Sequence, residues 1–172
     1  MTTVIARNFK NLKLYLSDKQ LIKKKIGLVP TMGCLHDGHL SLVKKCKLSG
    51  CFTIVTIFVN PIQFNKKKDL LKYPSQERAD ILILKKYNVD LIFIPKLNDV
   101  YPKNFSTYLN ESLYSNILCG IKRRGHFSGV LTIVLKLFTL TNPDIAFFGE
   151  KDYQQLVIVK KMVKTTLYVN SH

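Results

Sequence analysis

Short apolar runs rich in β-branched residues alternate along this chain with longer segments whose apolar residues recur at helical spacing. The runs that predict strands are KIGLVP (25–30), FTIVTIFVN (52–60), VDLIFIP (89–95) and DIAFFG (144–149). The run at 52–60 is apolar on both faces, which is typical of a parallel strand covered by helices on both sides. We therefore expect a parallel sheet whose strands are buried.

The segments between and after these runs predict helices, which extend from about Gly38 to Gly50, over 75–88, over 127–141 and over 150–163. In the second helix, the positions that recur on adjoining turns are Ala79, Leu82, Ile83 and Lys86. The lysine-rich stretch before it is expected to be a loop. Alternation of strands and helices predicts an α/β fold, a doubly wound parallel sheet with right-handed crossovers, in a single domain over residues 1–172.

Polar segments with chemically useful side chains follow three of the predicted strands. They are PTMGCLHDGH (30–39), NPIQFN (60–65) and GEKDYQQ (149–155). Ligands of doubly wound folds bind in the crevice beyond the carboxyl ends of the parallel strands. We therefore expect one ligand site that uses all three segments.

His36 and His39 form an H-x-G-H motif between the first predicted strand and the next helix, with Gly33 and Gly38 beside them. A glycine-rich turn exposes backbone N–H groups, and the helix N-terminus adds partial positive charge, so a phosphate binds well there. Two imidazoles on this turn supply further donors for phosphate oxygens that gain charge in a transition state. The alternative is that one histidine caps the helix and the other is a surface residue.

The formal net charge of +16 comes almost entirely from lysine, because arginine occurs only at Arg7, Arg78, Arg123 and Arg124. Readout of bases and bidentate binding of phosphate favour arginine. We therefore expect no nucleic-acid partner and interpret the lysine excess as compositional bias. A basic surface that binds nucleic acid, or that gathers small anions, is the alternative.

Cysteine content and hydropathy indicate the compartment. The four cysteines, Cys34, Cys46, Cys51 and Cys119, form no CxxC pair, so they are expected to be reduced thiols of a cytoplasmic protein. No run approaches the roughly 18 apolar residues of a membrane span. The N-terminus lacks an apolar core followed by a cleavage site. We expect neither secretion nor a membrane partner.

The H-x-G-H motif alone is typical of a broad class of α/β nucleotidylyltransferases, but longer strings narrow the class. VPTMGCLHDGHLSLV, IFVNPIQFN, DLLKYP, VDLIFIP, GHFSGV and DIAFFGEKDYQQLVIVKKMV occur in this order from about residue 5 to Val163. Together they resemble the pantothenate synthetase (pantoate–β-alanine ligase) family. Another nucleotidylyltransferase would not explain NPIQF and GEKDYQQL in one chain.

This resemblance implies a Rossmann-like nucleotide-binding catalytic domain and an ATP-dependent C–N ligase. The family condenses (R)-pantoate with β-alanine to pantothenate through a pantoyl-adenylate intermediate and releases AMP and pyrophosphate. ATP is then a substrate, and Mg²⁺ is expected to bind with it, held by few protein ligands. Members of the family commonly pair, so a homodimer is among the expected partners.

The resemblance also assigns roles to residues whose motifs match. The first ATP-binding segment would be Met32, Gly33, Cys34, Leu35, His36, Asp37, Gly38 and His39, with His39 as the catalytic proton donor. The second would be Gly149, Glu150, Lys151 and Asp152, with Lys151 on the phosphates. Gln63 and Gln155 match the glutamines that contact pantoate. Asn60 would help to line that pocket, and Gln154 would face elsewhere because adjacent helix residues diverge.

The chain also departs from the family pattern. The family continues into a small C-terminal lid domain with an M-S-S-R type loop over ATP, and this lid is absent from the sequence, in which residues 164–172 are atypical. Closure of such a lid excludes water from the reaction. The alternative function is therefore a truncated remnant, weakly active or inactive, that keeps only nucleotide binding.

Overall fold

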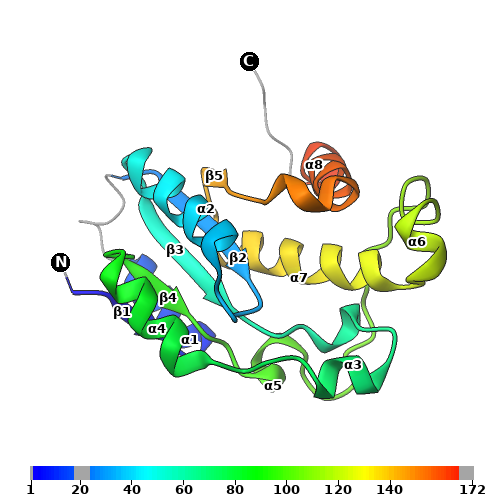
Figure 1. The fold of residues 1–172 in the computed structure, drawn as a ribbon, viewed down its shortest axis with the longest axis horizontal. Helices are drawn as coiled ribbons and strands as arrows, with labels where there is room; N and C mark the ends of the chain where they lie inside the picture. Colours follow the sequence, from blue (N-terminus) through cyan, green and yellow to red (C-terminus); the bar gives the residue numbers. More distant parts are fainter. Residues whose placement is uncertain (1, 18–23, 167–172) are drawn as a thin grey trace. The chain divides into compact units, whose positions relative to one another are not determined.

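The computed structural model of the protein describes residues 2–17 and 24–166 (Figure 1). The chain folds into two compact units. The first, which we call the sheet unit, contains residues 1–59, 74–105 and 136–148, and the second, the helical unit, contains 60–73, 106–135 and 149–172. The prediction of a single domain stays a prediction, and each unit is described separately.

The sheet unit contains five parallel strands, β1 (Val4–Ala6), β2 (Ile26–Thr31), β3 (Phe52–Ile57), β4 (Leu91–Phe93) and β5 (Ile145–Ala146). Their order is β1-β4-β3-β2-β5, and β2 and β3 pair in register along all six of their residues. The predicted parallel sheet is confirmed, with β1 as an additional edge strand. Every residue of β3 is buried, as its apolar sequence predicts.

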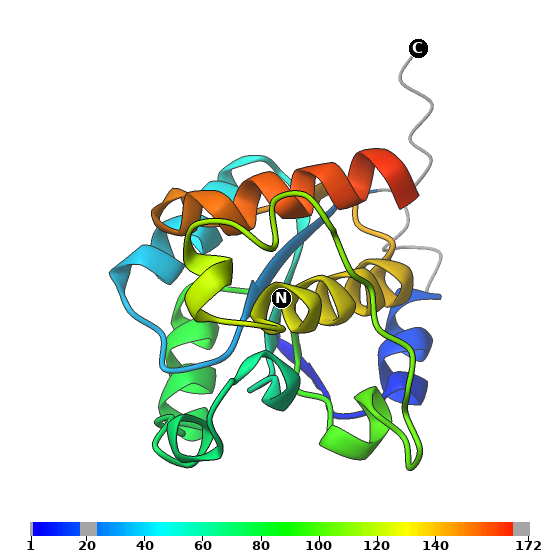
Figure 2. The same ribbon diagram turned by 90° about the vertical axis from the view of Figure 1, so that its right-hand side faces the viewer.

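Helices cover both faces of this sheet, as expected of a doubly wound fold. The connection from β1 to β2 contains α1 (Phe9–Leu16), and the connections from β2 to β3 and from β3 to β4 contain α2 (Asp37–Leu48) and α4 (Glu77–Lys86). The chain crosses the sheet in opposite directions in these steps. Figure 2 accordingly shows α1 on one face and both α2 and α4 on the other. Right-handed crossovers produce this arrangement.

The main apolar core fills the space between the sheet and α2 and α4. Val29, Val55 and Ile92 of the three central strands are fully buried against Val43 of α2 and Leu84 of α4. On the opposite face, the ring of Phe9 on α1 lies 6.0 Å from that of Phe93. Burial of aliphatic side chains on both faces, at about 1.5–3 kcal/mol each, stabilises the unit.

The helix predicted over 75–88 is confirmed as α4 (Glu77–Lys86). Asp80 and Leu84 are its buried residues, whereas Leu82 is 61% exposed. Asp80 is 2% exposed although it carries a carboxylate. Helical spacing alone cannot distinguish a buried polar residue with tertiary hydrogen bonds from a solvated one, so the sequence pattern did not identify Asp80 as part of the buried face.

A partly buried carboxylate, that of Asp90, lies at the amino ends of the strands. Asp90 accepts a hydrogen bond from the backbone N–H of Thr53 at 2.8 Å and pairs with the Lys47 ammonium at 3.0 Å. These bonds join the start of β3 to the end of α2. Asp90 therefore satisfies the N–H of Thr53 at the amino ends of the strands, whereas the predicted site lies at their carboxyl ends.

The helical unit contains η1 (Pro61–Gln63), α3 (Lys67–Leu71), α6 (Cys119–Lys122), η2 (Glu150–Asp152) and α8 (Tyr153–Thr166), together with most of α7 (His126–Thr141). The short helix α3 replaces part of the predicted lysine-rich loop. The sheet unit also contains α5 (Leu97–Val100). No helix within residues 2–17 and 24–166 is long and apolar enough to cross a membrane.

Glu111 ties the long connection before α6 to α8. Its carboxylate accepts hydrogen bonds from the backbone N–H groups of Leu113, Tyr114 and Ser115 and pairs with Lys161 of α8 at 2.7 Å. The Lys161 ammonium also lies 4.6 Å from the centre of the Tyr114 ring. One carboxylate therefore fixes a loop with little secondary structure against a helix far along the chain.

Gly27 on β2 packs so closely that an added Cβ would overlap the Cys46 sulfur and lie 3.0 Å from Cys51 Cβ. We expect Gly27→Ala to lower the free energy of unfolding by about 1–3 kcal/mol, the usual cost of overpacking a core. Urea denaturation measures this loss. Cys46→Ala removes the sulfur, so Gly27→Ala should cost less in the double variant, and strictly additive effects would contradict the packing explanation.

Candidate functional site

The turn between β2 and α2 reverses the chain through two consecutive left-handed residues. Gly33 has φ of 82° and Cys34 has φ of 53°. Glycine adopts this conformation freely, but cysteine does so at a cost, so other contacts must hold the turn. The strand ends at Thr31 and the helix begins at Asp37, which places the H-x-G-H motif on this corner as predicted.

Side chains of the protein already accept the N–H groups of this turn. Thr31 Oγ1 accepts from Gly33 N at 3.2 Å and donates to the Thr56 carbonyl at 2.7 Å. The Asp80 carboxylate accepts from Cys34 N at 2.8 Å and from Leu35 N at 2.9 Å. The amides of Gly33, Cys34 and Leu35 are therefore occupied within the protein, and phosphate binding at this turn stays a prediction. The N–H groups of a left-handed turn need acceptors within the protein. Once bound to these acceptors, the same N–H groups are not available to a ligand.

His36 and His39 lie side by side where α2 begins. Their ring centres are 4.1 Å apart, and His36 Nδ1 caps the helix by accepting from Gly38 N at 3.1 Å. His39 lies in the first turn, where its Nδ1 is buried without a hydrogen-bond partner among the described residues. The alternative interpretation was that one histidine caps the helix and the other is a surface residue. It is correct for the cap, His36, but not for His39, which is partly buried.

The surroundings of His39 favour its neutral form. Burial lowers the pKa of His39, the neighbouring His36 lowers it further, and Asp80 acts in the opposite direction. At neutral pH the imidazole is therefore uncharged and carries one N–H donor and one acceptor. Such a neutral ring still offers one N–H to a phosphate oxygen.

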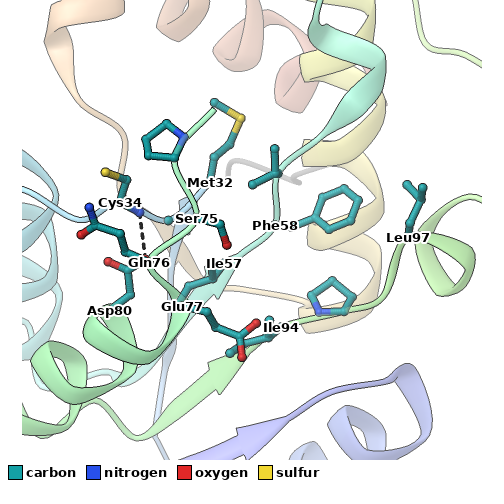
Figure 3. Close-up of a pocket in the computed structure, with 14 residues that line it drawn as sticks. Met32, Cys34, Ile57, Phe58, Ser75, Gln76, Glu77, Asp80, Ile94 and Leu97 are labelled. Carbon is teal, nitrogen blue, oxygen red and sulfur yellow. Dashed lines mark hydrogen bonds between the residues drawn. The ribbon is translucent and has the colours of Figure 1, made fainter. Parts of the chain in front are cut away.

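A cavity of about 240 Å³ lies beyond the carboxyl ends of β2, β3 and β4 (Figure 3). Its walls include Met32, Gly33 and Cys34 from the predicted first ATP segment, with Phe58 and Asp80 from other segments. Figure 3 shows the bond from the Cys34 N–H to Asp80 at its side. The turn that carries the histidines thus also forms one wall of a cavity in the sheet unit.

In the helical unit, Gln63 is held by its neighbours. Asn60, 1% exposed, donates through its amide to Gln63 Oε1 and to the Gly129 carbonyl, each at 3.0 Å. His126 Nδ1 lies 2.8 Å from the Gln63 carbonyl. Because a carbonyl only accepts, Nδ1 of His126 carries the proton. Asn60, predicted to line the pocket, therefore orients the glutamine side chain directly.

The GEKD segment and the two glutamines after it differ in their surroundings. Lys151 is exposed on η2, and Gln155 is partly buried in the first turn of α8. Gln154 donates to the carbonyls of Tyr114 and Ile117 and accepts from Cys119 N. Gln154 thus binds the loop before α6, so the prediction that it faces differently from Gln155 agrees with these contacts.

The structure brings the predicted residues together in two groups, one in each unit. The sheet unit holds the segment from Met32 to His39, whereas the helical unit holds Gln63, the segment from Gly149 to Asp152, and Gln155. The sequence analysis missed Asp80, His126 and Gly129. Two signals were available in the sequence. Asp80 is a charged residue within an apolar helical pattern, and Gly129 is a glycine within a predicted helix.

A parallel doubly wound sheet with H-x-G-H at the corner between β2 and α2 defines a Rossmann-like α/β protein of the nucleotidylyltransferase type. The family model for pantoate-beta-alanine ligase matches residues 4–170. The chain therefore belongs to the pantoate–β-alanine ligase family. The matched residues extend past Val163, the last residue of the motifs that carry the resemblance in the sequence.

Curated relatives include the pantothenate synthetases of Carboxydothermus hydrogenoformans and Roseobacter denitrificans, each 47% identical to this chain. The alignments cover 90% and 95% of this chain but 55% and 58% of the relatives. The chain thus spans little more than half the length of these proteins.

Solved structures agree in fold. The Francisella tularensis pantoate-beta-alanine ligase, crystallised with beta-gamma ATP and beta-alanine, has a TM-score of 0.91 and 46% identity, over 96% of this chain and 63% of its own. The Thermus thermophilus pantothenate synthetase has a TM-score of 0.86 and 40% identity, over 95% and 57%.

Gly129 tests the packing around Gln63. An added Cβ would lie 2.7 Å from the backbone N and Cα of Gln63, which cannot move aside without shifting η1. Helix propensity alone predicts that Gly129→Ala stabilises α7 by up to about 1 kcal/mol. We expect the reverse, a loss of about 1–3 kcal/mol in urea denaturation. Gly149→Ala is the control, because nothing lies within 4 Å of its added Cβ. A stabilised Gly129→Ala variant would contradict this packing.

The buried histidines predict a pH dependence. Burial lowers the pKa of both His39 and His126 below the ordinary 6.5. The unfolded chain therefore binds more protons than the folded one below about pH 6.5, so stability is full above this pH and decreases as pH falls toward the folded pKa.

We expect the free energy of unfolding to fall between pH 7 and pH 5, by at most about 1.4 kcal/mol per pH unit for each histidine. Urea denaturation at pH 7, 6 and 5 measures the slope. His126→Asn removes one titrating group and should make the slope shallower. An unchanged slope in this variant would rule out a contribution from His126.

Proposed function

We propose that this chain takes part in the ATP-dependent condensation of pantoate with β-alanine to pantothenate. The observation that carries the proposal is the pair of imidazoles, 4.1 Å apart, at the start of α2 in a member of this ligase family. Adenylation of a carboxylate builds negative charge on phosphate oxygens, and two neighbouring donors with a helix N-terminus stabilise such charge.

In the proposed reaction, the pantoate carboxylate attacks the α-phosphorus of ATP, and pyrophosphate leaves. The amine of β-alanine then attacks the acyl carbon of the adenylate, forming the amide bond and releasing AMP. His39 donates a hydrogen bond to the phosphate where charge develops, and His36 supports it. The neutral form that burial favours for His39 keeps one N–H available for this contact at pH 7.

The helical unit supplies the remaining contacts in this proposal. Lys151, an exposed cation, binds the phosphates of ATP together with its GEKD neighbours. Gln63 and Gln155 bind pantoate, whose hydroxyls and carboxylate need both donors and acceptors, which an amide provides. The bonds from Asn60 and His126 to Gln63 fix its position before substrate arrives.

Mg²⁺ fits the proposal as a companion of ATP. Within the described residues, no three His, Cys, Asp or Glu side chains gather into a group that could hold a metal ion. A magnesium ion bound chiefly by phosphate oxygens and water needs few protein ligands. It would offset charge on the phosphates, while the residues named above bind and orient the substrates.

Nucleotide binding without ligation is the second candidate function. The observation behind it is that the histidine turn, from Met32 to His39, lies within the sheet unit alone. In this case ATP binds at the histidine turn, but no pantothenate forms. Homodimer formation stays a prediction under either candidate.

Matched lysine variants test the ligase proposal. We expect the chain to form labelled pantothenate from ATP, pantoate and isotope-labelled β-alanine, and Lys151→Ala to lower the rate by about 100- to 1000-fold through loss of a phosphate contact. Lys160→Ala removes another exposed lysine of the same unit and should leave the rate unchanged.

His39→Ala provides the background of the assay. Product formation by the wild-type chain no greater than that of His39→Ala, with ATP binding retained in calorimetry, would favour the binding-only function. Equal rates in Lys151→Ala and Lys160→Ala would contradict the assigned role of Lys151.

A further inference from the structure

The turn before α2 is held by a carboxylate from a different helix. Asp80 on α4 accepts hydrogen bonds from Cys34 and Leu35, which lie 46 and 45 residues earlier in the chain. Each carboxylate oxygen takes one N–H, at 2.8 Å from Oδ2 and 2.9 Å from Oδ1. Two consecutive amides that converge on one anion form the type of backbone pocket that binds phosphate elsewhere. Here the anion is part of the protein.

Three further observations show that the turn is built around this carboxylate. Asp80 is 2% exposed, so water does not solvate its carboxylate, and the two N–H donors stabilise the buried charge instead. An added Cβ on Gly33 would lie 3.0 Å from Asp80 Oδ2, so glycine leaves the room that the carboxylate occupies. Cys34, whose N–H is the first donor, has a left-handed φ of 53°. The hydrogen bond from the Cys34 N–H to Asp80 therefore offsets the backbone strain at Cys34.

The same carboxylate acts on the histidine pair. Asp80 is one of the two charged or titratable groups that influence His39, and the other is His36. The turn that Asp80 holds leads directly into the helix cap at His36 and the first turn at His39. Position and electrostatics of the imidazoles therefore both depend on one buried side chain.

We infer that Asp80 is a positioning residue, which holds the 33–35 turn so that the imidazoles of His36 and His39 face an incoming phosphate in a fixed arrangement. The structural part of this inference stands alone, whereas its catalytic consequence rests on the proposed function. It also implies that phosphate is bound by the imidazoles and the helix start, since the amides of Cys34 and Leu35 are occupied.

Amide and imidazole NMR signals of Asp80→Asn test the inference. The variant keeps the shape of the side chain but loses its charge, so the ¹H signals of the Cys34 and Leu35 amides should shift and exchange faster with solvent. The pKa of His39, followed through its ring protons, should fall because the carboxylate that raises it is gone. A variant with purely structural effects would not move this pKa in a defined direction.

Asp90→Asn is the matched control. It removes the charge of a partly buried carboxylate that also accepts a backbone N–H in the same unit, at the amino ends of the strands. This variant should leave the Cys34 and Leu35 amides and the His39 titration as in the wild type. If Asp80→Asn leaves both readouts unchanged, or if Asp90→Asn alters both equally, the inference is wrong.

Two measurements keep the test decisive. If Asp80→Asn fails to fold, hydrogen exchange in the wild-type chain replaces it, where rapid exchange at Cys34 and Leu35 would overturn the inference. Calorimetry with Mg·ATP adds the functional readout, in which Asp80→Asn should weaken binding by up to about 100-fold. A wild-type chain that binds no ATP would refute nucleotide binding, while the NMR result would still decide the role of Asp80.

Discussion

The bond between the Asp80 carboxylate and two backbone N–H groups is the interaction on which the histidine turn depends. A chain that leaves a buried strand through consecutive left-handed residues has amide donors that the backbone carbonyls of the sheet and helices do not accept, so side chains have to accept them. Here Thr31 and Asp80 supply the acceptors, so these donors are satisfied within the protein. The free-energy cost of burying a carboxylate is offset by two hydrogen bonds with charge assistance.

This constraint changes how the turn can bind an anion. In phosphate-binding loops, the backbone amides themselves commonly surround the phosphate. In this protein Thr31 and Asp80 accept the equivalent donors, and the side chains beside them are the adjacent rings of His36 and His39. Under the proposed function, anion binding through the rings can be coupled to proton transfer, because an imidazole can gain or lose a proton and an amide cannot.

Sequence patterns predicted most of the sheet but fewer of the contacts that hold the site. The uniformly apolar β3 and the H-x-G-H corner were visible because their signals are local. The three-residue strand β1 and the five-residue helix α3 are too short for periodicity to detect. Asp80 was missed because its acceptor role depends on amides 45 and 46 residues away, and no local pattern encodes such a distance.

Gln63 is held by the same physical principle, although it lies in the other unit. A buried amide of Asn60 orients the Gln63 side chain, and a buried imidazole of His126 binds its backbone carbonyl. Glycine again provides the close approach, at Gly129 as at Gly33. In both places the residues with a proposed chemical role lie at the start of a helix or on a short 3-10 helix, and buried polar side chains fix the adjoining backbone. Loss of such a support would displace the chemical groups without removing them, which is why substitutions away from the substrate can reduce the rate of an enzyme.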